Sequence, residues 1–255
     1  MATTEMYEKL AASGATGDFL RPGGLALTER ALSFCSFSSG ARILDVGCGA
    51  GGTVEYLINH HRLRAVGVDP SSVLLGYGRR RGPCLPLVLA SGEDLPFADS
   101  DWDGVFVECS LSVAKDAGRV LGECSRVLRA GGRLILSDVY STNPGVNATG
   151  FCLPSSCRAI EIVSREELTK RLNVSGFQVT FWEDQSRALK EFVAQLILSN
   201  GSVPQFWCPV DHGKGNGEQF PTTFEFAAGV KPGYFLCVAQ KSIRDMKSIA
   251  GELQS

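Results

Sequence analysis

The sequence predicts an α/β fold in which helices cover both faces of a mostly parallel sheet. Three observations lead to this class. Short apolar runs alternate with helical patterns between residues 41 and 137. The first run leads directly into a glycine-rich turn at 47–52, as expected where a strand turns sharply into a helix. The 255 residues are 44% hydrophobic and 20% charged, which is the composition of a globular protein.

Five short apolar runs are expected to form the parallel part of the sheet. Each is bounded by turn residues, which is typical of strands that are buried on both faces. These strands cover residues 41–46, 64–69, 87–90, 103–107 and 133–137. Helices with apolar residues at helical spacing are expected between them, at 51–61, 71–81 and 116–128. The pair Gly131-Gly132 is expected to end the third helix.

The pattern changes after residue 138. Residues 139–163 form a connection that is too long for a simple loop. Ser164, followed three residues later by Glu167, fits a capping box and predicts a helix to about residue 175. The remaining expected elements are a strand at 177–183, a helix at 186–199 and a strand at 234–241.

The chain is expected to consist of a small cap and one large domain. Residues 1–40 predict a helical N-terminal cap that is broken at Arg21-Pro22-Gly23-Gly24. Residues 41–255 predict a Rossmann-like three-layer sandwich, with insertions at about 139–163 and 201–233.

Charge and composition exclude several classes of protein. Lys and Arg number 25 against 27 Asp and Glu, and the net charge of −2 argues against a nucleic-acid surface. The one basic run, Arg79–Arg81, is interpreted as a solvated helix end. No apolar run is long enough to cross a membrane, and the first residues do not resemble a signal peptide, so a cytoplasmic location is expected. The nine cysteines include no C-x-x-C pair, and they are expected to be mostly free thiols without a metal site.

The stretch ILDVGCGAGG, residues 43–52, matches G-x-G-x-x-G. A dinucleotide would place its negatively charged pyrophosphate on this turn, where Asp45 would repel it. S-adenosylmethionine carries a positive sulfonium and a positive amino group, which a carboxylate attracts. Asp45 therefore favours this cofactor over NAD, although it could instead accept hydrogen bonds from the N–H groups of the turn.

Asp69 stands 20 residues after Gly49, at the end of the second expected strand. A carboxylate at this position can bind both hydroxyl groups of a ribose. The sequence Asp69-Pro70-Ser71 is also a good helix cap, and the two roles are compatible.

Four motifs in order resemble the class I methyltransferases that use S-adenosylmethionine and release S-adenosylhomocysteine. They read ILDVGCGAGG, AVGVDPS, SGEDLPFADSDWDGV and RVLRAGGRLILSDVY. The sequence is most similar to the branch of the ubiquinone and menaquinone biosynthetic enzymes, closely over about residues 41–140 and more weakly to residue 185. The resemblance implies a sixth strand and an antiparallel seventh strand, for which 177–183 and 234–241 are suited.

The resemblance also implies which residues bind the cofactor. The methionine and ribose portions would be lined by Asp45, Gly47, Cys48 and Gly49, with Asp69 on the ribose. Adenine would lie at Ser91-Gly92-Glu93, where the family often has Asp or Asn in place of Ser91. Glu108 falls where the methionine portion and the substrate meet. It could bind the amino group of the cofactor or act on the substrate, or it could be a solvated strand end.

The methyl acceptor is expected to be a small molecule held by the parts added to the core. Candidate substrate residues are Tyr7, Cys152, Cys157 and Cys208. The cysteines give a weaker similarity to arsenite methyltransferases, in which thiolates bind a soft centre, but they could also be ordinary packing residues. His60, His61 and His212 are interpreted as solvated, so no catalytic residue is predicted. A protein that binds the cofactor without catalysis is the alternative function.

Overall fold

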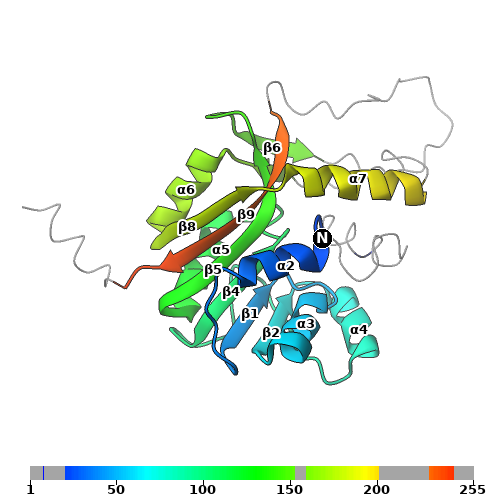
Figure 1. Cartoon of the computed structure of the whole chain (residues 1–255), viewed down its shortest axis with the longest axis vertical. Coiled ribbons are helices and arrows are strands. Elements are labelled where there is room, and N and C mark those ends of the chain that lie inside the picture. Colours follow the sequence, from blue (N-terminus) through cyan, green and yellow to red (C-terminus); the bar gives the residue numbers. More distant parts are fainter. Residues whose placement is uncertain (1–7, 9–20, 153–158, 201–229, 244–255) are drawn as a thin grey trace, which may run out of the picture.

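The computed structural model describes residues 8, 21–152, 159–200 and 230–243 (Figure 1). A seven-stranded sheet forms its centre, in the order β3-β2-β1-β4-β5-β9-β8. The bounds of these strands are β1 Arg42–Val46, β2 Arg64–Asp69, β3 Leu87–Leu89, β4 Trp102–Glu108, β5 Leu128–Ser141, β8 Phe177–Asp184 and β9 Pro232–Lys241.

The directions of the strands confirm the predicted fold class. Strands β3, β2, β1, β4 and β5 are parallel, and β9 runs antiparallel to both of its neighbours, β5 and β8. The last strand therefore lies inside the sheet rather than at its edge. Its sequence explains this position, because residues 233–239 are buried without alternation, as in a strand that is covered on both faces.

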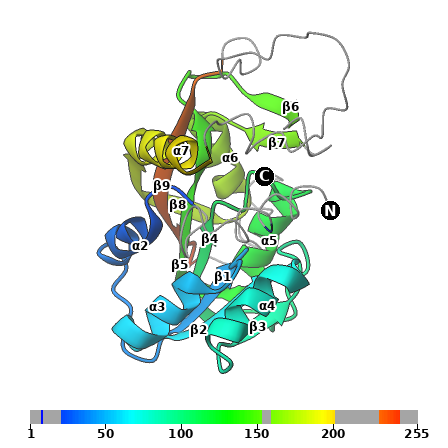
Figure 2. The same cartoon turned by 90° about the vertical axis from the view of Figure 1, so that its right-hand side faces the viewer.

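Two helical layers cover the sheet (Figures 1 and 2). The helices are α2 Gly24–Leu32, α3 Gly52–His61, α4 Ser72–Arg81, α5 Ala117–Val127, α6 Arg165–Val174 and α7 Ser186–Asn200. Helices α2, α3 and α4 contribute Ala31, Leu57 and Leu75 to one apolar cluster. Helices α5 and α6 contribute Leu121 and Leu172 to the cluster on the other face. The three-layer sandwich is thus confirmed.

The predicted cause for the end of α5 was wrong. The helix already ends at Val127, because Leu128 has the extended backbone of a strand. The pair Gly131-Gly132 lies inside β5, where Gly131 has φ +75° and Gln240 donates a hydrogen bond to its carbonyl at 3.1 Å. The pairing of β4 with β5 shifts register here, so the glycines form an irregularity in a long strand.

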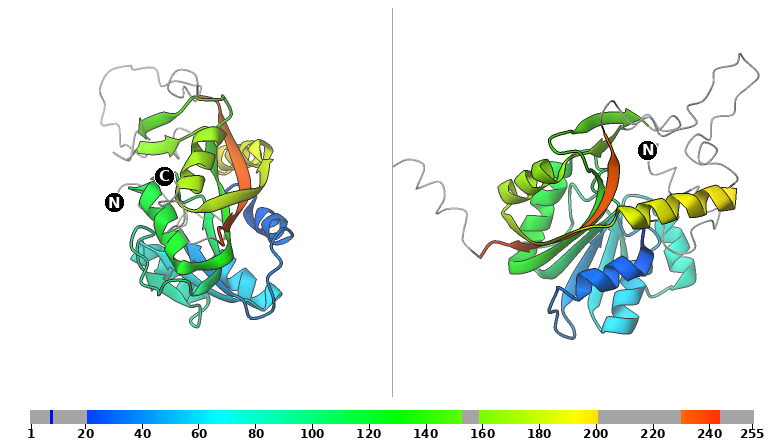
Figure 3. Two further views of the ribbon diagram at one scale, coloured as in Figure 1. Left: turned by 90° about the vertical axis from the view of Figure 1, so that its left-hand side faces the viewer. Right: turned by 45° about the horizontal axis from the view of Figure 1, so that its top comes forward.

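The connection after β5 contains a hairpin that the sequence did not reveal. Strand β6 (Ala148–Cys152) pairs antiparallel with β7 (Ala159–Ile162) (Figure 3). The hairpin comes after the carboxyl end of β5, and the Ser141 N–H donates to the Val163 carbonyl at 2.9 Å. The insertion predicted at 139–163 is therefore structured at both ends.

No helix in the part of the chain that is described is long and apolar enough to cross a membrane.

Candidate cofactor site

The glycine loop after β1 forms a bare backbone surface at the carboxyl edge of the sheet. The N–H groups of Gly47 and Cys48 both donate to the Val68 carbonyl, at 2.8 and 3.0 Å, which ties the loop to β2. Gly47 and Gly49 have φ values of +79° and +55°, which side chains rarely adopt. A Cβ on Gly49 would meet no atom within 4 Å, so the backbone there is open to a ligand. The predicted role of these glycines fits this geometry.

Asp45 lies beneath this loop as the next-to-last residue of β1 and is only 3% exposed. Among the residues that the structure describes, none donates a hydrogen bond to its carboxylate. The N–H groups of Gly47, Cys48, Gly49 and Gly51 donate to other acceptors, so the alternative in which Asp45 accepts from the turn is wrong. Burial raises the pKa of Asp45 to about 8, the charges of Glu108 and Asp69 raise it too, and Arg21 opposes them. A positive ligand group would favour the ionised form of this side chain.

Asp69 joins the glycine loop to the start of α4. Its Oδ2 accepts from the Gly49 N–H at 2.9 Å, and its Oδ1 accepts from the Ser71 N–H at 2.8 Å. Burial raises the pKa of Asp69, and these two hydrogen bonds act against the rise. The predicted helix cap is also present, but Ser71 makes it by accepting from the Leu74 N–H at 3.1 Å. Asp69 thus stands at the predicted ribose position, with both oxygens oriented.

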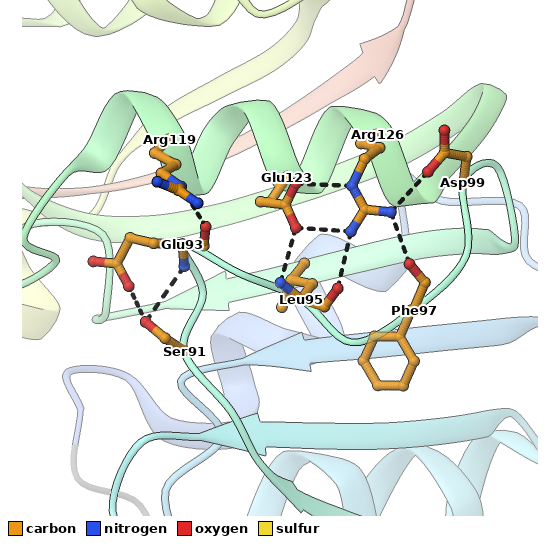
Figure 4. Close-up of polar contacts among 8 residues, drawn as sticks. All are labelled: Ser91, Glu93, Leu95, Phe97, Asp99, Arg119, Glu123 and Arg126. Atoms are coloured by element: carbon orange, nitrogen blue, oxygen red, sulfur yellow. Dashed lines mark hydrogen bonds and ion pairs between the residues drawn. The ribbon is translucent and has the colours of Figure 1, made fainter.

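The segment predicted to read adenine comes after β3 and is shown in Figure 4. The Ser91 hydroxyl donates to the Glu93 carboxylate, whose other oxygen accepts from the Lys115 N–H at 2.9 Å. A Cβ on Gly92 would lie 2.9 Å from Val46, so this segment packs tightly against the end of β1. Ser91 and Glu93 therefore brace each other beside the glycine loop.

Two arginines of α5 hold this segment in place, and the sequence alone did not single them out (Figure 4). Arg119 donates from Nε to the Glu93 carbonyl at 2.7 Å. Arg126 donates to the carbonyls of Leu95 and Phe97 at 2.9 and 2.7 Å. Glu123 fixes Arg126 through both carboxylate oxygens, at 2.8 and 2.7 Å. The charge pattern of an amphipathic helix resembles a solvated face, which concealed this role.

Glu108, at the end of β4, is buried rather than solvated, so that alternative for it was wrong. The Arg21 guanidinium lies 2.8 Å from its Oε2. Thr28 of α2 donates to Oε1 and Thr53 of α3 donates to Oε2, both at 3.1 Å. Both oxygens of Glu108 are therefore engaged by the protein. Arg21, Thr28 and Thr53 are site residues that sequence reasoning missed.

Comparison with known proteins identifies the family. Residues 44–136 match the family model described as a methyltransferase domain. An O-methyltransferase of Aspergillus sclerotiorum is 30% identical over 187 residues, which are 64% of this chain and 66% of the relative. A demethylmenaquinone methyltransferase of Beutenbergia cavernae is 35% identical over 130 residues, which are 51% of this chain and 53% of the relative. An O-methyltransferase of Aspergillus nomiae is 30% identical over 155 residues, which are 57% of this chain and 68% of the relative. The chain therefore belongs to the class I S-adenosylmethionine-dependent methyltransferases.

The fold is shared more widely than the sequence. The crystal structure of the cyclase SpnF has a TM-score of 0.76 and 20% identity, and the match covers 95% of this chain and 96% of that one. The first three curated relatives are each matched over 54–66% of their length, which is less than two thirds. Membership in the family implies the methyltransferase fold and the predicted cofactor, S-adenosylmethionine.

The described residues of the chain fit the cofactor that was predicted. Gly49 offers open backbone, and Asp45 is a buried carboxylate without a described donor. Burial strongly raises the pKa of the Cys48 thiol, so Cys48 is a neutral, half-buried wall of the site. Within the described ranges, no group of three or more His, Cys, Asp or Glu side chains could hold a metal ion.

Most of the predicted substrate residues lie outside the part of the chain that the structure describes. This applies to Tyr7, Cys157, Cys208 and also to His212, while Cys152 ends β6 and only its backbone is described. The solvated interpretation of His61 was incomplete, because its Nε2 lies 2.5 Å from the Glu29 carboxylate.

Apolar and helical runs of the sequence also carry Cys109, Cys124 and Cys237, where a cysteine usually acts as a small packing residue. Cys124 and Cys237 are buried. Cys109 is only half-buried, and it comes directly after Glu108 with φ +56°.

Proposed function

We propose that the protein transfers a methyl group from S-adenosylmethionine to a small-molecule acceptor. The observation that carries this proposal is the buried carboxylate of Asp45 beside an open glycine loop. A sulfonium and an ammonium group suit this environment, whereas a pyrophosphate would be repelled by it. The similarity to named methyltransferases supports the same reaction class.

Each part of the cofactor has a proposed partner among the described residues. Asp69 accepts hydrogen bonds from the ribose hydroxyls through the lone pairs that remain on its two oxygens, which the Gly49 and Ser71 N–H groups hold in place. The braced segment Ser91–Glu93 lines the adenine. Asp45 binds the ammonium group rather than Glu108, since the charge of Glu108 is already paired with Arg21 and Asp45 has no such partner among the described residues.

Methyl transfer requires the protein mainly to orient the acceptor relative to the methyl group of the cofactor. When bound, the cofactor supplies an electrophilic methyl group that an acceptor displaces in line from sulfur. The chain must hold the acceptor about 3–3.5 Å from that carbon and exclude water.

The relative from Aspergillus sclerotiorum is named an O-methyltransferase, so we propose a hydroxyl acceptor as the first class to examine. The nearly balanced charge of the chain supports a small molecule rather than a nucleic acid as its partner. A cytoplasmic location and the division into a cap over 1–40 and a domain over 41–255 stay predictions.

A second candidate is a protein of this fold that binds the cofactor without transferring its methyl group. The observation in its favour is that SpnF, which this chain matches over nearly its whole length, is named a cyclase. The two candidates predict the same cofactor binding but different fates of the methyl group.

A labelled-methyl screen separates the candidates. The full chain is incubated with S-adenosylmethionine carrying a labelled methyl group and with phenol, quinol, amine, thiol and trivalent-arsenic acceptors. Transfer of label to one class, with loss on Asp45→Asn and retention on the exposed control Asp94→Asn, supports the proposal. Tight cofactor binding with no transfer to any class favours the second candidate.

A further inference from the structure

Arg21 is a buried cation at the carboxyl edge of the sheet. It is 8% exposed and precedes α2, in the turn that the sequence marked with Pro22. Its Nη2 donates to the Thr28 hydroxyl at 2.6 Å and to the Gly24 carbonyl at 3.3 Å. The same nitrogen lies 2.8 Å from Glu108. The guanidinium is therefore held in one orientation by α2 on one side and by β4 on the other.

This cation lies close to the side chains expected to meet the methionine portion of the cofactor. The charge of Arg21 lowers the pKa of Asp45 on β1 and of Tyr234 on β9, against the larger effect of burial at both groups. Glu108, its ion-pair partner, ends β4, which is the neighbour of β1. Arg21 thus lies at the end of β4, the strand beside the one that leads into the glycine loop.

The amino-acid end of S-adenosylmethionine is a zwitterion and needs partners of both signs. Asp45 can satisfy the ammonium group, but the α-carboxylate would be repelled by Asp45, Glu108 and Asp69 unless a cation lies nearby. Arginine suits this task because its planar guanidinium carries five N–H donors in a fork that matches a carboxylate.

We propose that Arg21 binds the α-carboxylate of the cofactor and that Asp45 binds its ammonium group, so that residues before α2 complete the cofactor site. Glu108, Thr28 and Thr53 are positioning residues in this arrangement, because they fix the guanidinium and do not themselves contact the cofactor. The inference rests on the proposed function only in taking S-adenosylmethionine as the ligand.

The test compares ligands that differ in a single group. Affinities of the full chain are measured by calorimetry for S-adenosylmethionine, its decarboxylated analogue and 5′-methylthioadenosine. The wild-type protein is expected to bind S-adenosylmethionine on the order of 10- to 100-fold more tightly than the decarboxylated analogue. Arg21→Gln is expected to lose this preference, with the affinity for 5′-methylthioadenosine unchanged. Arg21→Lys is expected to restore part of it, and the exposed control Arg187→Gln to retain all of it.

Three results would overturn the inference. Equal affinity of the wild-type protein for S-adenosylmethionine and its decarboxylated analogue would show that no cation recognises the carboxylate, whatever the fate of the variants. An equal loss of all three ligands in Arg21→Gln would show that Arg21 acts only by holding α2 in place. Failure of the wild-type protein to bind S-adenosylmethionine at all would refute the proposed function itself, and this inference with it.

Discussion

Replacing Asp45 by Asn is expected to stabilise the cofactor-free protein at neutral pH and to weaken cofactor binding. Burial, together with the charge of Glu108, raises the pKa of Asp45 from an ordinary 3.8 to about 8. The folded state therefore binds this proton more tightly than the unfolded state does. The stability contributed by the group is fully present below about pH 4 and is lost as the pH rises through about 8.

The loss of unfolding free energy depends on how far the pH lies above the unfolded-state pKa of Asp45, up to its folded-state pKa. Each pH unit between the two pKa values costs the wild-type protein about 1.4 kcal/mol of unfolding free energy. At pH 7 the loss reaches an upper limit of about 4 kcal/mol relative to acidic solution. Asn cannot ionise and has nearly the same shape, so Asp45→Asn avoids this loss. Its advantage over the wild-type protein should grow steadily between pH 5 and pH 8.

Urea unfolding without cofactor, repeated at pH 5, 6, 7 and 8, measures this difference directly. Asp94→Asn is the matched control, because Asp94 is exposed and should show no growing advantage. Calorimetry on the same samples should show that Asp45→Asn binds S-adenosylmethionine more weakly than the wild-type protein does. A stability difference that is independent of pH, or one that favours the wild-type protein at pH 8, would refute the reasoning.

Three further predictions concern the frame of the site. Glu108→Ala leaves a buried guanidinium without its ion-pair partner and should lower the unfolding free energy by about 3–5 kcal/mol, whereas a loss below about 1 kcal/mol in urea unfolding would contradict the ion pair. Gly47→Ala would place a Cβ 2.4 Å from the Cβ of Ser110, at a φ of +79°, and should lower the unfolding free energy by about 1–3 kcal/mol. The control Gly122→Ala lies at an open position of α5 and should be neutral or stabilising in thermal unfolding. Arg126→Gln removes the donors to the Leu95 and Phe97 carbonyls and should speed backbone hydrogen exchange across residues 93–99. Unchanged exchange there would show that Arg126 does not stabilise this segment.

The sequence was sufficient for the order of strands and helices because each parallel strand is a short apolar run with clear turns. It failed where the pattern was ambiguous. Gly131-Gly132 reads as a helix end, yet the glycines lie in a long strand, since Leu128 and Arg133 on either side of them both pair with β4. The hairpin of β6 and β7 was missed because the Gly, Asn and Pro residues of the connection at 139–163 resemble a loop.

The cofactor site was predictable only where its residues lie on one motif. Asp45, Gly49 and Asp69 could be placed from spacing, because the strands that carry them end at one edge of a parallel sheet. The partners of Glu108 could not be found in this way. Thr28 is 80 residues away in sequence, and only the packing of α2 beside β4 brings the two side chains together. The sequence left open whether Glu108 is buried, and the residues that neutralise its charge are a property of the tertiary structure.

The central claim is that the glycine loop and its carboxylates select a cationic nucleoside over a dinucleotide. Calorimetric titration of the full chain with S-adenosylmethionine and with NAD, under one buffer and salt concentration, tests it most directly. We expect one molecule of S-adenosylmethionine to bind per chain and NAD to bind far more weakly or not at all. Tighter binding of NAD, or no binding of S-adenosylmethionine, would contradict the assignment of Asp45 and Asp69.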